Sequence, residues 1–236
     1  QFALSVWRLL LSALCVWMAS GNVAALVETG FPAKPIRWIV PFAPGSTDLL
    51  ARVIGQKASE TLGQPLVIET RPGAGGSIGT GYVAKSAADG YTLLLGNAGP
   101  ITINPSLHKK MPYDAQRDLL PIAMLSGSPM VLVAHPSLPV KTVKEFVQFA
   151  KQRPGQINYC SSGVGNLTHL GMEYLQSIGG IKLNHVPYKG AAPAFIDLIA
   201  GQCSIMFANI TGSMTHIGSR RVRVIAVSSA KRAAVL

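Results

Sequence analysis

From Ile36 onward, short apolar runs alternate with stretches in which apolar residues recur at helical spacing. An apolar run of four to eight residues fits a buried strand, and apolar residues three or four positions apart fit one face of a helix. A regular alternation of the two is typical of parallel sheets covered by helices. The pattern therefore predicts an α/β protein.

In the first half of the chain, strands are expected at 36–40, 66–69 and 91–95. Helices are expected at 48–62 and from the loop 71–76 to about residue 85, and Gly63 is the stop signal of the first. One side of that first helix is predicted to be apolar and carries Leu49, Leu50, Val53, Ile54, Ala58 and Leu62.

In the second half, strands are expected at 130–133, 157–160, 182–186, 204–207 and 222–227, and helices at 142–151, 167–177 and 193–199. Thr142 and Glu145 have the spacing of a capping box at the start of the first of these helices. Two lobes are expected, residues 30–126 and 127–221. Residues 222–236 are expected to cross back to the first lobe, which would lack elements if the protein ended at Leu236.

The N-terminal residues have the layout of a secretory signal peptide. Arg8 precedes an apolar run at 9–18, and small residues follow up to Val23-Ala24-Ala25. The alternative is a membrane anchor, but the run is about half the roughly 20 residues that a spanning helix needs. Residues 1–25 are therefore expected to be removed on export.

The charge balance indicates an anionic partner. The chain has 21 Lys and Arg residues against 10 Asp and Glu residues, and residues 1–25 contain only one of these charges, Arg8. The basic residues are scattered, with no stripe that alternates with aromatic residues, so nucleic acid is not expected. A positive field that attracts a small anion is the inference.

Three strand ends lead into loops of small residues that run toward helices, at 42–47, 96–100 and 161–166. Ligands of open parallel sheets bind at such ends, and backbone N–H groups at a helix start bind carboxylate or phosphate. His169 follows the third loop and is expected to donate to a bound carboxylate, or else to serve as a cap or packing residue. The alternative for each loop is an ordinary turn between strand and helix.

No enzymatic motif is convincing. The G-x-S-x-G match at 75–79 does not follow a strand directly, and Gly79-x-Gly81-x-x-Ala84 falls inside a predicted helix. Ser162 or Cys160 could act as a nucleophile with His169 as base, but no third group is evident. The five histidines have no metal-ligand spacing, so neither a metal nor another cofactor is expected.

Cys160 and Cys203 would both remain after export. A disulfide between them is possible in an oxidising compartment. Their apolar surroundings favour two free, buried cysteines instead.

Several motifs occur in the order found in one family. They are PAKPI (32–36), PFAPG (41–45) followed by Thr47-Asp48, RPGAGG (71–76), DGYTLLLG (89–96), INPSL (103–107), PYD (112–114), SSG (161–163), HVPYKG (185–190) and AVSSAKR (226–232). With them the chain resembles the periplasmic receptors of tripartite tricarboxylate transporters, the Bug proteins, over nearly all residues from Pro32 onward.

The resemblance implies a type II periplasmic binding protein fold, with two α/β lobes that close on a small carboxylated solute. It also implies a monomer that passes its ligand to a membrane permease and has no catalytic residues. Family members hold the carboxylate largely through backbone N–H groups and ordered water. The positions that match the family's ligand contacts are Phe42, Ala43, Gly45, Ser46, Thr47, Asn97 and Ala98 in the first lobe and Ser162, Gly163, Asn166, Thr168, His169 and Asn209 in the second.

The sequence departs from the family in three places. The loop between Pro44 and Thr47 is one residue shorter, and Ala208 replaces an Asp common in the family, which disfavours an amino-acid ligand. The family continues beyond the position of Leu236, so the C-terminal part of the fold is expected to be missing. Di- and tricarboxylates and aromatic acids remain open as ligands, and a sensor without a transport role or a truncated, non-functional product remain alternative functions.

Overall fold

The first sheet of the computed structural model, which describes residues 30–236, has three parallel strands. They are β1 (Ile36–Val40), β2 (Leu66–Thr70) and β3 (Thr92–Leu94), in the order β2-β1-β3. The central strand β1 is the most buried, and Ile39 and Val40 have no exposed surface. The predicted strands are thus confirmed with shifts of one residue, and the expected signal peptide at 1–25 lies outside the described residues.

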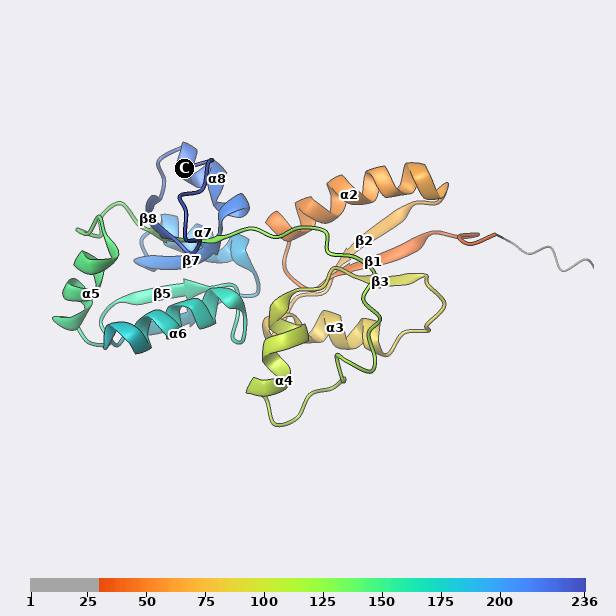
Figure 1. Ribbon diagram of the computed structural model, residues 1–236, viewed down its shortest axis with the longest axis horizontal. Helices are drawn as coiled ribbons and strands as arrows, with labels where there is room; N and C mark the ends of the chain where they lie inside the picture. Colours follow the sequence, from red (N-terminus) through yellow and green to blue (C-terminus); the bar gives the residue numbers. More distant parts are fainter. Residues whose placement is uncertain (1–29) are drawn as a thin grey trace, which may run out of the picture. The chain divides into compact units, whose positions relative to one another are not determined.

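Helices α2 (Ser46–Leu62) and α3 (Ser77–Ala84) lie on opposite faces of this sheet (Figure 1). A Cβ atom on Gly55 would lie 3.1 Å from Ile68 Cδ1 and 3.5 Å from the Trp38 ring, so the bare glycine lets α2 approach the sheet closely. Gly63 ends α2 in the left-handed conformation, with φ of 68°, which confirms the predicted stop.

The predicted apolar side of α2 faces the sheet only in part, since Ile54 packs against the core cluster that contains Trp38. Ala51 and Gly55 are buried there, whereas Leu49 and Val53 are 61% and 63% exposed. The prediction was wrong for Leu49 and Val53 because the small residues, four positions apart, allow the closer approach to Trp38 and so set the rotation of the helix.

The second sheet is mixed. It contains β4 (Met130–Ala134), β5 (Asn158–Ser161), β6 (Asn184–Pro187), β7 (Ile205–Asn209) and β8 (Arg223–Val227), in the order β6-β5-β7-β4-β8. Strand β5 is parallel to β6 and β7, but β4 is antiparallel to β7 and β8. The expectation of parallel sheets is therefore wrong for this sheet. The apolar pattern of a buried strand does not depend on whether the strand runs parallel or antiparallel to its neighbours.

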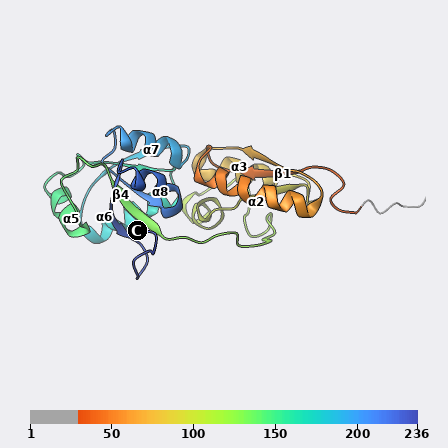
Figure 2. The same ribbon diagram turned by 90° about the horizontal axis from the view of Figure 1, so that it is seen from above.

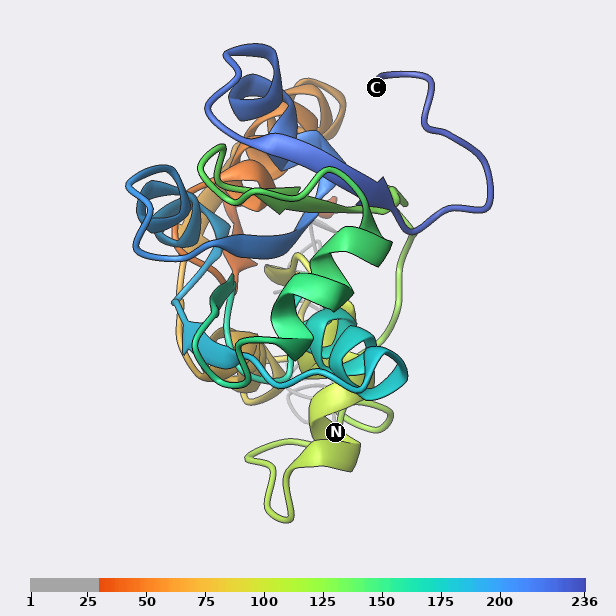
Figure 3. The same ribbon diagram turned by 90° about the vertical axis from the view of Figure 1, so that its left-hand side faces the viewer.

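Four helices cover the second sheet: α5 (Val143–Lys151), α6 (Leu167–Gly179), α7 (Ala191–Ile199) and α8 (Ile210–Gly218). Figure 3 shows α5 and α6 on one face and α7 and α8 on the other. Tyr159 packs with Phe146 and Met172 on the first face, and its neighbour Cys160 packs with Phe195 and Met206 on the second. The strands alternate between the two faces, as the two-residue period of a strand requires.

The helix start predicted at Thr142 is confirmed. Thr142 Oγ1 accepts a hydrogen bond from the Glu145 N–H at 3.1 Å. The reciprocal bond is displaced by one residue, since Glu145 Oε2 accepts from the Lys141 N–H at 2.7 Å.

Some elements were not predicted. A 3₁₀ turn at Ala74–Gly76 precedes α3, a π-helical turn at Gly99–Ile103 runs into α4 (Asn104–Leu107), and α8 follows β7 directly. Residues 119–129, by contrast, have no regular structure and lead into β4 (Figure 2).

Cys160 and Cys203 are joined by a disulfide, so the expectation of two free cysteines is wrong. Cys160 lies on β5, and Cys203 lies just before β7, the strand that pairs with β5. Chain order does not reveal this strand pairing, which places the two α-carbons 5.9 Å apart.

Residues 222–236 remain with the second sheet as far as the structure describes them. β8 pairs with β4, and Ala233 and Leu236 pack against the apolar cluster that contains Phe195. The crossover to a first lobe, like the lobe boundaries, stays a prediction. No helix in residues 30–236 has the length and apolar character to span a membrane.

Candidate functional site

The first candidate loop ends in a helix start without a side-chain cap. Gly45, the N-cap of α2, has an extended backbone, and no side chain accepts from the first turn. Among the described residues, no acceptor is found for the N–H groups of Ser46, Thr47 and Asp48. These donors, at the positive end of a 17-residue helix, are suited to bind an anion.

A second uncapped helix start lies beside the first. Gly190, the N-cap of α7, also has no side-chain cap, and a Cβ on it would lie 3.2 Å from the Cβ and N atoms of Ala43. The Ala43 N–H donates to the Lys189 carbonyl oxygen at 3.0 Å, and a Cβ on Gly45 would lie 3.4 Å from Ala192 Cβ. The starts of α2 and α7 therefore meet.

Sequence reasoning missed the α7 start as a binding element. Its signals in the sequence were Gly190 at the end of the HVPYKG motif and Pro193 in the first helical turn. Because Pro193 has no N–H, the donors that α7 offers come from Ala191 and Ala192.

The loop at 161–166, expected to offer N–H groups to a ligand, uses most of them internally. The Ser162 N–H donates to Thr168 Oγ1 at 2.9 Å, and the Gly163 N–H donates to Ser161 Oγ at 3.2 Å. The Gly165 N–H is directed at His169 Nδ1, 3.4 Å away. These groups are unavailable to an anion unless the loop rearranges.

Side chains that were expected to contact a ligand act as caps. Asn166 Oδ1 accepts from the Thr168 N–H at the start of α6, and Asn209 Oδ1 accepts from the Thr211 N–H at the start of α8. In the loop at 96–100, Asn97 Oδ1 accepts from the Gly99 N–H at 3.1 Å, and Ala98 is the N-cap of the π-helical turn.

His169 is engaged by the protein at both ring nitrogens. Nδ1 faces the Gly165 N–H, and Nε2 lies 3.8 Å from Glu173 Oε1. Burial lowers the pKa of His169, and the charge of Glu173 opposes this effect. The side chain thus supports the loop in this structure rather than pointing a free donor at a ligand.

Glycine backbones bring the other candidate loops together. A Cβ on Gly75 would lie 2.1 Å from the Val164 carbonyl oxygen, and one on Gly163 would lie 3.2 Å from Gly75 Cα. Phe42, which is almost fully buried, packs against Gly76. The loops of the first sheet therefore touch the 163–165 turn of the second.

Asn104 is a further residue of this contact that sequence reasoning missed. It is fully buried, its Nδ2 donates to Ser77 Oγ at 2.8 Å, and its Oδ1 has no partner among the described residues. That oxygen faces Gly165, on which a Cβ would lie 1.9 Å away.

The arrangement does not provide a catalytic nucleophile at the expected positions. Cys160 is in a disulfide, and Ser162 Oγ is bonded to Thr168 Oγ1 at 2.8 Å rather than to His169. A Ser–His pair that was not predicted, Ser161 with His185, is 2.6 Å apart, but Ser161 has no exposed surface. In the described part of the chain, no cluster of three or more His, Cys, Asp or Glu residues could hold a metal.

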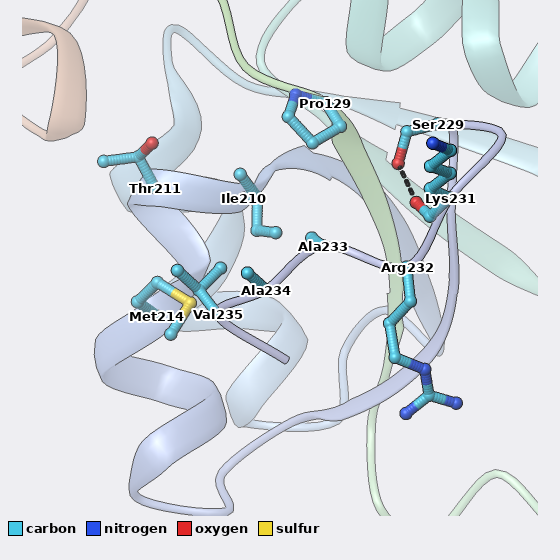
Figure 4. A pocket seen from close by; sticks show the side chains of 10 residues that line it. All are labelled: Pro129, Ile210, Thr211, Met214, Ser229, Lys231, Arg232, Ala233, Ala234 and Val235. Atoms are coloured by element: carbon cyan, nitrogen blue, oxygen red, sulfur yellow. Dashed lines mark hydrogen bonds between the residues drawn. The ribbon is translucent and has the colours of Figure 1, made fainter.

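Two cavities of the described part of the chain lie away from these helix starts. One of about 560 Å³ lies between the start of α8 and residues 229–235, where Ile210, Met214 and Val235 form its apolar wall (Figure 4). Another of about 600 Å³ is lined by residues around Lys34, Tyr82 and Tyr91. Neither includes the helix starts described above, which are in direct contact with each other.

Comparison with known proteins identifies the family. The model of the tripartite tricarboxylate transporter family receptor matches residues 50–236. Protein BugT of Bordetella pertussis is 40% identical over 226 residues, covering 94% of this chain and 69% of the relative. A protein encoded in the tcbD-tcbE intergenic region of a Pseudomonas species is 34% identical, covering 95% and 67%.

Solved structures agree. A periplasmic transporter has a TM-score of 0.84 and 39% identity, with 87% of this chain and 69% of that chain covered. An R. palustris protein solved with adipate has a TM-score of 0.83 and 36% identity, with 86% and 68% covered. MatC from Rhodopseudomonas palustris, solved with malate, has a TM-score of 0.82 and 30% identity, with 86% and 69% covered.

This chain thus spans about two thirds of the length of these relatives. The similarity confirms the α/β periplasmic binding protein fold and a binding function without catalysis. The chain belongs to the family of tripartite tricarboxylate transporter receptors, the Bug-type periplasmic solute-binding proteins.

Proposed function

We propose that this chain binds a small carboxylated solute where α2 and α7 begin and passes it to a membrane permease. The observation that carries the proposal is the contact between two helix starts that lack side-chain caps, at Gly45 and Gly190. Relatives solved with adipate and malate support the carboxylate class.

The electrostatics of this region favour an anion, because the carboxylate in the first turn of α2, Asp48, is paired with Arg52 at 2.9 Å. A single helix start contributes only about 0.3 to 1 kcal/mol to anion binding near the surface, so several N–H donors must act together. Ser46 and Thr47 on α2 and Ala191 and Ala192 on α7 supply such donors from two directions. The chain's formal charge of +11 favours the approach of the same ligands.

The remaining predicted site residues form the surroundings in this proposal. Ser162, Gly163, Asn166 and Thr168 shape the wall built by the 161–166 loop, and His169 supports it. Phe42, Asn97 and Ala98 shape the wall on the side of the first sheet, and Asn209 orders the start of α8.

Binding is coupled to contact between the two helix starts. The hydrogen bond from Ala43 to Lys189 joins the loop after β1 to the loop before α7. We call the state with the starts of α2 and α7 in contact the joined state. A ligand that binds both helix starts has a higher affinity for the joined state than for the separated state, and this difference in binding free energy stabilises the joined state. That joined state is the form we expect the permease to accept.

The proposal is tested by thermal unfolding of residues 26–236 with adipate, malate, citrate, benzoate and glutamate. A ligand at 100 times its dissociation constant adds about 2.7 kcal/mol to the free energy of unfolding, which raises the melting temperature. Adipate, malate or citrate is expected to do so. Absence of any shift with all five acids would contradict the proposal.

Two variants localise the site. Ser46→Glu places a carboxylate at the start of α2, where it competes with an anionic ligand, and is expected to abolish the shift. Gln56→Glu makes the same charge change at an exposed position of the same helix and is expected to leave the shift unchanged. Equal effects of the two variants would argue against a site at the helix start.

A further inference from the structure

Two histidines lie behind the turn formed by residues 163–165. His169, on the first turn of α6, stacks on His185 of β6 with ring centroids 4.3 Å apart. His185 stacks in turn on Tyr159 of β5, with centroids 4.7 Å apart and the planes only 10° from parallel. This three-ring stack is packed against the residues that precede and follow the turn.

One histidine holds the turn through a serine. The Gly163 N–H donates to Ser161 Oγ at 3.2 Å, and the same oxygen lies 2.6 Å from His185 Nε2. Ser161 is fully buried, so its hydroxyl proton needs an acceptor within the protein. An unprotonated Nε2 of His185 provides this acceptor.

The other histidine holds the turn directly. The Gly165 N–H is directed at His169 Nδ1, which can accept only if that nitrogen is unprotonated. His169 Nε2 then carries the ring proton, on the side of Glu173. Glu173 also accepts a hydrogen bond from the Tyr159 hydroxyl, and these two residues are the titratable groups that face the histidine pair among the described residues.

The turn held in this way is the part of the 161–166 loop that the first sheet contacts. Gly75 packs against Gly163 and Val164, and Asn104 packs against Gly165. At such short backbone separations, a rotation of either peptide group would disrupt the contact. The orientation of the turn therefore decides whether the loops of the two sheets fit together.

We propose that neutral His169 and His185 position the Gly163–Gly165 turn, and that protonation of either ring releases it and weakens ligand capture in acid. A protonated His185 would leave the Ser161 hydroxyl without an acceptor. A protonated His169 would place an N–H group at Nδ1 opposite the Gly165 N–H, and two donors cannot form a hydrogen bond. Both histidines are positioning residues and contact no ligand. The ligand-capture part of the proposal rests on the proposed function.

Burial is consistent with neutral rings at physiological pH. It lowers the pKa of His185 to about 4, and the charge of His169 adds to this effect while Glu173 opposes it. The pKa of His169 is also below its ordinary value, again mainly through burial.

The test uses isosteric replacements that do not titrate. In His169→Asn, the amide oxygen takes the place of Nδ1 as acceptor for Gly165, and in His185→Gln, the amide group takes the place of Nε2 beside Ser161. His169→Leu removes the acceptor. His108→Asn, at an exposed position, is the matched control.

The first readout is the affinity for adipate and malate by calorimetry from pH 7.5 to pH 4.5. We expect the wild type to weaken about tenfold more than the His169→Asn/His185→Gln double variant, which corresponds to about 1.4 kcal/mol. Protonation of the ligand in acid changes the apparent affinity of both proteins equally, so the difference between the two proteins does not contain this effect. His169→Leu should bind weakly at every pH, and equal pH profiles of wild type and double variant would overturn the proposal.

The second readout needs no ligand. Amide hydrogen exchange of Gly163 and Gly165 in the free chain, expressed as protection factors, should fall in acid in the wild type and the control but not in the double variant. If neither acid binds the wild type at pH 7.5, the proposed function fails. The protection factors alone then test whether the two histidines position the turn. Protection that is independent of pH in the wild type would then overturn it.

Discussion

The α-carbon of Gly75 packs directly against the peptide group of Val164, so that a Cβ atom on Gly75 would lie 2.1 Å from the Val164 carbonyl oxygen. Gly75 also has φ of 60°, in the left-handed region. The loop after β2 and the loop after β5 therefore meet backbone to backbone, at a position that only glycine can occupy.

Gly75→Ala is expected to weaken carboxylate binding at least tenfold, about 1.4 kcal/mol, because the added methyl group forces the two loops apart. Gly63→Ala is the matched control, since Gly63 has φ of 68° and nothing within 4 Å of its Cβ position. Both variants should lose about 1 to 2 kcal/mol of folding stability from left-handed strain. Calorimetry with adipate and malate should separate them, and equal affinities would show that the Gly75 contact is irrelevant to binding.

The disulfide between Cys160 and Cys203 closes a loop with a sequence separation of 43 residues. Replacing both cysteines by alanine is expected to lower the free energy of unfolding by about 2 to 4 kcal/mol, because the unfolded chain regains the freedom that the crosslink removes. Urea unfolding measures the change. Reductant should destabilise the wild type and leave the double variant unaffected. The expectation would be contradicted if the free energy of unfolding of the wild type were the same with and without reductant.

The strands were predicted well because their apolar runs are bounded by turn residues. The run at Ile36–Val40 is bounded by Pro35 and Pro41, and the structure has the same bounds. What a run cannot show is its direction or its neighbours. For that reason the antiparallel placement of β4 and the pairing of Cys160 with Cys203 emerged only from the fold.

The rotation of α2 illustrates a second limit of the pattern. Counting apolar residues predicts that Leu49 and Val53 are buried with Ile54, whereas the sheet contacts Ile54 together with Ala51 and Gly55. Small residues bury less apolar area themselves but allow the helix to pack closely on Trp38. The choice between these sides depends on the tertiary partner, which no window of sequence contains.

For the candidate site, the sequence predicted which loops are involved but not which of their backbone N–H groups remain without an acceptor in the protein. The loop at 161–166 is where it was predicted, yet Thr168 and Ser161 occupy its N–H groups. Conversely, Gly190 was not predicted as a site residue because it has no side chain that could bind a ligand. Asn104 was not predicted because it lies in a segment without a predicted helix or strand. Which donors remain free depends on side-chain contacts that arise only on folding.

Thr142→Ala should cost about 1 kcal/mol of folding stability, because the N–H of Glu145 loses its acceptor at the start of α5. Thr61→Ala is a suitable control, since the Thr61 hydroxyl bonds the Lys57 carbonyl oxygen on the exposed last turn of α2. That variant is expected to change stability by less than about 0.5 kcal/mol. Urea unfolding at pH 7.5 compares them, and equal losses would mean that the cap is not the source of the effect.

The histidine pair predicts how folding stability depends on pH. In the unfolded chain, histidine titrates with a pKa of about 6.5. In the folded chain, burial lowers the pKa of His185 to about 4 and that of His169 below its ordinary value. The unfolded state therefore binds more protons between these pH values, and stability must fall as the pH drops from about 6.5 toward 4.

Urea unfolding at pH 7.5, 6.5, 5.5 and 4.5 should show this loss in the wild type and a flatter profile in the His169→Asn/His185→Gln variant. His216, whose pKa burial and the charge of Arg221 also lower, adds a smaller slope in the same direction that both proteins share. The carboxyls of Glu69 and Asp118, which have lowered pKa values because Arg37 and Arg117 bond them, contribute only in more acidic solution. A wild-type profile as flat as that of the double variant would mean that the two rings gain a proton in the folded chain as easily as in the unfolded one, and that burial does not hold them neutral.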